Sequence, residues 1–199
     1  MNTEIINYPT NLEEQIIQDS KIFYPSITLQ KSDLERFIRK CFRDENFLFC
    51  SKYIIICKIT STIFTFNELS LLKFNLSRPV FSTNMNNISF SLPEKIKNNE
   101  KVETIFLGYL KKISSFLSEI NESLNEKDYL MFYPPICTIN YLISQNLLEW
   151  LDLCSLKECN NISFELKSLS ENLFEKLSEK YPFVFNSLTY KIFLRIKRR

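Results

Sequence analysis

Glu149 and Asp152, in the segment "LLEWLDLC", are the side chains whose spacing best suits acid–base chemistry. Three residues apart on a helix, they share one face, where two carboxylates can act as acid and base or bind a metal ion. The alternative is the solvated face of an amphipathic helix, with Trp150 on the apolar side. We favour the solvated face, because carboxylates ordinarily stay in water.

The chain has no histidine and a single glycine among its 199 residues. Without histidine there is no imidazole base, no Ser–His or Cys–His nucleophile pair and no His-ligated metal. A lone glycine within a helical pattern also excludes phosphate-binding and dinucleotide-binding loops, in which the backbone must approach phosphate closely. We therefore expect a protein that is not an enzyme, with no catalytic residue, no cofactor and no small-molecule ligand.

Six cysteines occur in a chain long enough to bury a core without disulfides, and none forms a Cys-x-x-Cys pair. We expect reduced, buried thiols and no metal site, hence a cytoplasmic or nuclear protein. The N-terminal segment lacks a basic region followed by an apolar run. The most apolar run, "YIIICKI", is far shorter than the roughly 20 residues that cross a bilayer, so we expect no membrane insertion.

The one cluster of charge lies at the C-terminal end and comprises Lys191, Arg195, Lys197, Arg198 and Arg199. It can contact nucleic-acid phosphates, act as a nuclear import signal, dock on an acidic protein or simply end a helix in solvent. The net charge of +2 gives no general argument for nucleic acid. Arg36, Arg39 and Lys40 have acidic neighbours and are interpreted as an ordinary solvated helix face.

Eighteen phenylalanines and nine tyrosines supply a large apolar surface. Most of these rings belong in a core, but exposed apolar patches mark binding sites for partners. The proline-stiffened segment "YLMFYPPICTINYL" is our candidate for such a patch, unless it caps the core instead. Its candidate partner-binding residues are Tyr129, Met131, Phe132 and Tyr133.

The hydrophobic patterns predict an α+β fold with N-terminal helices, a small, mostly antiparallel sheet at about 47–92 and a helical C-terminal half. "YIIICKI" is predicted to be a central strand covered on both faces. The predicted helices lie at 10–19, 32–43, 102–124, 136–153 and 166–180, with a further helix favoured over a strand at the C-terminal end. Two domains are predicted, 1–98 and 99–199, or one continuous domain.

Gly108, in "ETIFLGYLKK", interrupts the strongest helical pattern of the chain. An exposed glycine within a helix costs about 1 kcal/mol relative to alanine, so its presence needs a reason. We expect close packing against another part of this chain or contact with a partner, unless the position is unconstrained. Gly108 is therefore a further candidate partner-binding residue.

A small sheet followed by helices, the turn into "SLPEKI" (Ser91 to Ile96), and "LFEKLSEK" (Leu173 to Lys180) before a basic tail are together similar to GINS replication-complex subunits of the sheet-first type. The resemblance covers about the last hundred residues and implies a subunit of a DNA-replication complex. The chain departs from that pattern in lacking a Leu-Pro-Leu-Trp-type start to the helical region and in having two extra N-terminal helices.

We expect a non-catalytic intracellular subunit or adaptor of a multiprotein complex, which binds protein partners through helix faces and an apolar loop. The alternatives are a GINS-like or nucleic-acid-associated protein that uses the basic C-terminus, and a viral host-interaction protein. A metal-independent enzyme that uses carboxylates is a further alternative. The bias toward Ile, Phe, Asn, Lys and Ser is typical of an AT-rich genome.

Overall fold

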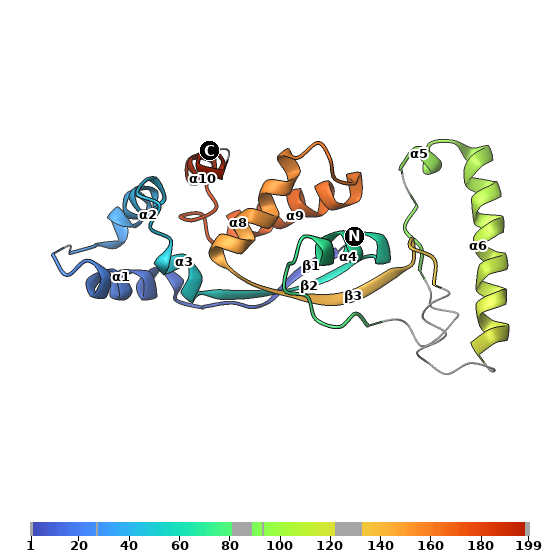
Figure 1. Cartoon of the computed structure of the whole chain (residues 1–199), viewed down its shortest axis with the longest axis horizontal. Coiled ribbons are helices and arrows are strands. Elements are labelled where there is room, and N and C mark those ends of the chain that lie inside the picture. Colours follow the sequence, from blue (N-terminus) through green and yellow to red (C-terminus); the bar gives the residue numbers. More distant parts are fainter. Residues whose placement is uncertain (1, 27, 81–88, 93, 122–132, 198–199) are drawn as a thin grey trace. The chain divides into compact units, whose positions relative to one another are not determined.

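The computed structural model describes residues 2–26, 28–80, 89–92, 94–121 and 133–197 (Figure 1). Its strands, β1 (Asn2–Asn7), β2 (Ile54–Thr62) and β3 (Thr138–Asn146), pair as an antiparallel sheet in the order β1–β2–β3. The helices are α1 (Leu12–Phe23), α2 (Leu34–Arg43), α3 (Leu48–Lys52), α4 (Ile63–Leu71), α5 (Glu94–Lys97), α6 (Glu100–Asn121), α8 (Leu147–Ser155), α9 (Phe164–Lys180) and α10 (Ser187–Lys197). The predicted α+β class is confirmed.

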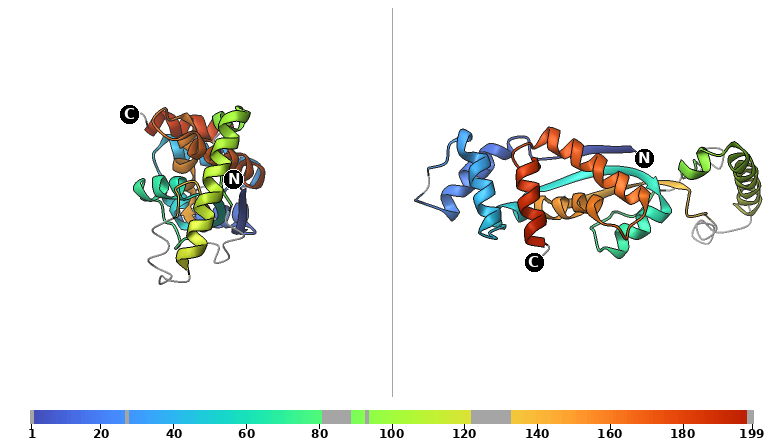
Figure 2. Two further views of the ribbon diagram at one scale, coloured as in Figure 1. Left: turned by 90° about the vertical axis from the view of Figure 1, so that its right-hand side faces the viewer. Right: turned by 90° about the horizontal axis from the view of Figure 1, so that it is seen from above.

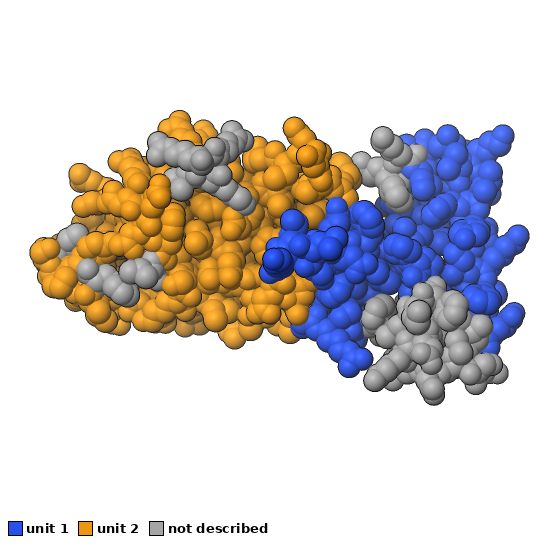
Figure 3. All heavy atoms as spheres, in the orientation of Figure 1, with its two compact units in different colours: residues 1–2, 59–73, 77–141 blue, residues 3–58, 74–76, 142–199 orange. Residues whose placement is uncertain are grey.

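The chain divides into two compact units, each built from segments far apart in the sequence (Figure 3). The first unit consists of 1–2, 59–73 and 77–141, and the second of 3–58, 74–76 and 142–199. Strands β2 and β3 contribute residues to both units. The division into folding domains at residues 1–98 and 99–199 stays a prediction.

The segment "YIIICKI" supplies most of β2, and β2 is the central strand, as predicted. Ile55, Cys57 and Ile59 are fully buried, whereas Ile54 and Lys58 are exposed. Because successive side chains of a strand point to opposite faces, the Ile54 face is only partly covered. The predicted burial on both faces is therefore incomplete.

Two segments within 47–92, where the sequence predicts short strands of the sheet, are helices instead. Residues 48–52 form α3 and residues 63–71 form α4. The Thr62 hydroxyl accepts a hydrogen bond from the backbone N–H of Thr65 at 3.2 Å and so caps the first turn of α4. The prediction failed because a short run of Ile, Phe and Thr fits a strand and a helix about equally well.

Strand β3 corrects the helix predicted over 136–153, of which only α8 is helical. Ile139, Tyr141 and Ile143 are buried in strict alternation with more exposed neighbours, which is the pattern of a strand. Isolated antiparallel pairings join Leu76 to Ile143, Val80 to Asn140 and Phe90 to Cys137.

The core of the second unit is formed where α8 and α9 pack together. Helix α9 confirms the helix predicted at 166–180, and its leucines Leu166, Leu169, Leu173 and Leu177 are fully buried. Trp150 of α8 is also fully buried, and its Nε1 donates a hydrogen bond to the carbonyl of Ile55 at 3.2 Å. This bond attaches the helical layer to the central strand.

The C-terminal segment is a helix, α10, as the sequence favours. It lies beside α2 in the second unit (Figure 2). The rings of Phe42 and Phe193 meet edge to face with centroids 6.3 Å apart. The Tyr190 hydroxyl donates to the carbonyl of Cys154 at 3.2 Å, which fixes α10 against α8 as well.

The element order that carried the resemblance to GINS subunits is a small sheet followed by an all-helical region. In the structure the sheet takes strands from 2–7, 54–62 and 138–146, so it is assembled from both halves of the sequence. The order on which the resemblance rests is therefore not the observed one.

Candidate functional site

Helix α6, with 22 residues, belongs to the first unit and confirms the helix predicted at 102–124. One side of it is buried. Leu110 and Leu117 are enclosed, and Leu117 packs with Tyr133 and Cys137 in an apolar cluster that Ile113 borders. Only part of the apolar surface of α6 is used in this packing.

A second line of apolar side chains on α6 remains in solvent. Its members are exposed to 42% (Val102), 67% (Ile105), 60% (Tyr109) and 48% (Phe116), and we call these four residues the α6 stripe. At about 3.6 residues per turn they fall on one side of the helix, next to the buried side. Exposed apolar surface gathered in this way is typical of a protein-binding site.

Gly108 lies next to the α6 stripe, one turn from Ile105. A Cβ atom at this position would meet nothing within 4 Å among the described residues, and its φ is not positive. No described part of this chain therefore packs closely against Gly108. A contact with a partner stays a prediction, beside an unconstrained position.

The apolar loop predicted from the sequence lies largely outside the described residues, since Tyr129, Met131 and Phe132 belong to 122–132. Tyr133 is described and is buried in the cluster with Leu117 and Cys137. Its ring contributes to the core of the first unit and is not part of an exposed patch.

Two of the predicted basic residues, Lys191 and Arg195, are exposed and lie one turn apart on α10. The side chain of Lys197 and both residues Arg198 and Arg199 lie outside the part of the chain that is described. Sequence reasoning treated Arg36, Arg39 and Lys40 separately from this cluster. The packing of α10 against α2 brings the two helices that carry these cations together.

Glu149 has a structural role at the start of α8. Its side chain accepts a hydrogen bond from the backbone N–H of Asn146 at 3.0 Å, and the Asn146 side chain accepts one from the backbone N–H of Glu149 at 3.0 Å. This reciprocal capping box satisfies two backbone donors at the helix end. The pattern Asn-x-x-Glu before an apolar run is the signal that could have identified it.

All six cysteines are free, and only Cys159 is exposed. Burial raises the pKa of the Cys57 and Cys137 thiols to about 12 each, so both are neutral at physiological pH. In the described ranges, no three His, Cys, Asp or Glu side chains are grouped closely enough to hold a metal ion. The five buried thiols therefore pack as small apolar groups.

Asp19, on α1, is the buried carboxylate of the second unit. Its carboxylate accepts hydrogen bonds from the Lys52 ammonium at 2.7 and 2.8 Å and from the Tyr53 hydroxyl. Desolvation by burial opposes the charge, but the bonds from Lys52 and Tyr53 outweigh it and lower the pKa of Asp19. The arrangement ties α1 to the segment that leads into β2, which is a structural task.

A scan against protein-family models and a search of curated proteins both found no match. Among the described helices, none combines the length and the apolar character that crossing a bilayer would require. The α6 stripe gathers four exposed apolar side chains on one helix of the described surface.

Proposed function

We propose that this protein is a non-catalytic subunit or adaptor that binds a protein partner through the α6 stripe. The observation that carries the proposal is the exposure of Ile105 and Tyr109, at 67% and 60%, in the middle of a 22-residue helix. Removing one such side chain from water contributes about 1.5–3 kcal/mol. A partner that covers the stripe therefore gains a substantial part of the free energy of binding.

The shape of the surface supports a helical or groove-forming partner. A helix of 22 residues is about 33 Å long, and an apolar line at three- and four-residue spacing is the pattern read by helix-binding grooves and by other helices. Gly108 beside the stripe allows a partner's backbone to come closer than any other residue would.

We place this activity in the cytoplasm or nucleus. The support is chemical: the cysteines are free, and five of the six are buried, which suits a reducing compartment.

The test is a quantitative pull-down from the cells that naturally make the protein, with partner identification by mass spectrometry. The variant Ile105→Gln/Tyr109→Gln removes two exposed apolar groups one turn apart on α6. The matched control, Ile22→Gln/Phe164→Gln, removes two apolar groups that are 72% and 67% exposed on α1 and α9. We expect a stoichiometric partner that resists 0.5 M salt, is retained by the control and is lost from the α6 variant.

Retention of the same partners by both variants would contradict the proposal. Sedimentation of the purified protein covers the remaining outcome. If the protein is a dimer that the α6 variant alone converts to a monomer, then a second copy covers the stripe and the adaptor function is wrong.

A further inference from the structure

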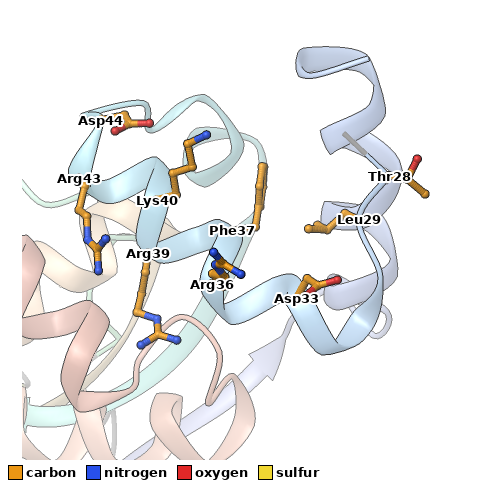
Figure 4. Close-up of a pocket in the computed structure, with 9 residues that line it drawn as sticks. All are labelled: Thr28, Leu29, Asp33, Arg36, Phe37, Arg39, Lys40, Arg43 and Asp44. Carbon is orange, nitrogen blue, oxygen red and sulfur yellow. The ribbon is translucent and has the colours of Figure 1, made fainter. Parts of the chain in front are cut away.

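The exposed side of α2 is hollowed into a groove of about 860 Å³ (Figure 4). Four cationic side chains of this helix line it: Arg36, Arg39, Lys40 and Arg43. Asp33 and Asp44 lie at the two ends of the helix and, with Thr28, complete the polar lining. The groove thus has a positive centre between two single carboxylates.

Three of these four cations have no ion-pair partner among the described residues. Arg39 lies 3.8 Å from the carboxylate of Glu35, one turn away on the same helix. In the part of the chain that the structure describes, Arg36, Lys40 and Arg43 form no ion pair. The groove lining thus carries four cations against two carboxylates, and this excess of positive charge favours an anionic ligand.

The four cations are held in place by the opposite side of the helix. Ile38 and Phe42 are fully buried there, and the contact of Phe42 with Phe193 joins α2 to α10. From Arg36 to Arg43 the helix rises about 10 Å, so the charges extend along the groove and do not converge on one point. Helix α10 adds the exposed cations Lys191 and Arg195 on the neighbouring element.

We propose that the groove along α2 binds the phosphate backbone of double-stranded nucleic acid, without reading its sequence. A row of arginines suits a row of phosphates, because each guanidinium donates in a planar fork that fits two phosphate oxygens. Backbone contacts of this kind supply affinity that is independent of sequence. The inference does not depend on the partner proposed for α6.

The apolar lining argues against two other anionic partners. Leu29 and Phe37 line the groove, but both are buried, at 7% and 8% exposure. An acidic protein segment would need apolar or aromatic anchors at the centre of its interface. A single strand would need exposed aromatic rings on which its bases stack, and the only aromatic ring of the lining is the buried Phe37.

The first measurement uses the full chain and a fluorescent 24-base-pair DNA duplex of arbitrary sequence. Fluorescence anisotropy gives the dissociation constant between about 50 and 200 mM salt. We expect micromolar affinity at low salt and a log–log slope of about −3 or steeper, since each phosphate contact contributes about −0.9. A slope near zero would overturn the proposal without any variant.

The second measurement compares two triple variants with the same change of charge. Arg36→Gln/Lys40→Gln/Arg43→Gln removes the unpaired cations of the groove, and Lys21→Gln/Lys58→Gln/Lys97→Gln removes three exposed cations elsewhere. We expect the groove variant to bind at least about tenfold more weakly and its slope to flatten by about 3, with a much smaller change for the control. Equal losses in both variants would overturn the assignment to the groove.

Competition distinguishes the kinds of anion. We expect unlabelled duplex to displace the probe at lower concentrations of charge than a single strand or polyglutamate. Tighter binding of the single strand, or equal competition by polyglutamate, would overturn the assignment to a duplex.

Circular dichroism checks the fold of each variant. Should the glutamine variant unfold, Arg36→Lys/Arg43→Lys keeps the charge but removes the forks, and unchanged affinity there would overturn the role of the arginines.

Discussion

Helices α6 and α9 have the same kind of sequence and opposite surroundings. Both carry apolar residues at three- and four-residue spacing over several turns. In α9 the leucines from Leu166 to Leu177 are fully buried within the second unit. In α6 Ile105 and Tyr109 remain mostly in water. An apolar repeat of three and four residues predicts a helix in both cases. It does not predict whether the apolar side of that helix is buried within the same chain.

The difference has an energetic meaning. A buried helix face contributes to the folding of its own unit, whereas an exposed one leaves its free energy of burial available for association. Variants in the two helices should therefore fail in different ways, those in α9 by unfolding and those in α6 by losing a partner.

The largest expected effect is on stability. Leu173→Ala in α9 should lower the free energy of unfolding by about 3 kcal/mol, because it removes buried atoms and leaves a cavity. Ile105→Ala in α6 should change it by no more than about 0.5 kcal/mol, because the side chain is already in solvent and alanine favours the helix. Urea unfolding followed by far-ultraviolet circular dichroism measures both. Equal losses would mean that the α6 stripe is packed within the chain.

A second expected effect is the dependence of stability on pH through Asp19 in the second unit. The pKa of Asp19 is lowered in the folded state, so its contribution to stability is complete above the ordinary Asp value of about 3.9. That contribution is lost as the pH falls through the lower folded value. Asp19→Asn should cost about 1–2 kcal/mol at pH 7 and should weaken the loss of stability below about pH 4.

Trp150 makes this effect measurable, because the only tryptophan of the chain is buried in the second unit, together with Asp19. Its fluorescence during unfolding at several pH values reports that unit. Asp33→Asn, at an exposed carboxylate, is the control and should retain the acid sensitivity of the natural protein. If the stability of Asp19→Asn falls with acid in the same way as that of the natural protein, the Asp19 carboxylate does not cause the acid sensitivity.

The smallest expected effect is at Gly108. Gly108→Ala should raise the free energy of unfolding by about 0.5–1 kcal/mol, since the added methyl group meets nothing within 4 Å. Thermal unfolding compared with Ser115→Ala, an exposed substitution on the same helix, measures the gain. A loss of stability would place another part of the chain against α6. Weaker binding of the α6 partner by a variant that is more stable would assign the glycine to the interface.

The sequence allowed the helices α1, α2, α6, α9 and α10 and the central strand to be predicted, but not the other two strands. Strand β3 was predicted as a helix, although Ile139, Tyr141 and Ile143 alternate with less buried residues, because Leu142 interrupts the alternation of polarity in the sequence. The apolar residues of 139–153 fit the period of a strand and that of a helix in part, and only the pairing with β2 decides between them. Helix α4 was mistaken for a strand for the same reason.

The candidate sites show the same limit. Glu149 was considered for acid–base chemistry, and its hydrogen bonds with Asn146 make it a helix cap. Arg36, Arg39 and Lys40 were interpreted as an ordinary solvated face because their acidic neighbours in sequence suggested compensation. Of these three cations, only Arg39 forms an ion pair with a described carboxylate within 4 Å.

The sequence by itself determined the helical periods, the lack of imidazole and the absence of glycine-rich phosphate loops, because these are properties of residue type and local spacing. The tertiary structure decided which strands pair, that α10 lies against α2, and which apolar side chains of α6 stay exposed. These features depend on contacts between residues far apart in the chain, and no local pattern encodes the partner of a helix face. For this protein, the exposed α6 stripe and the cationic groove of α2 are results of that kind.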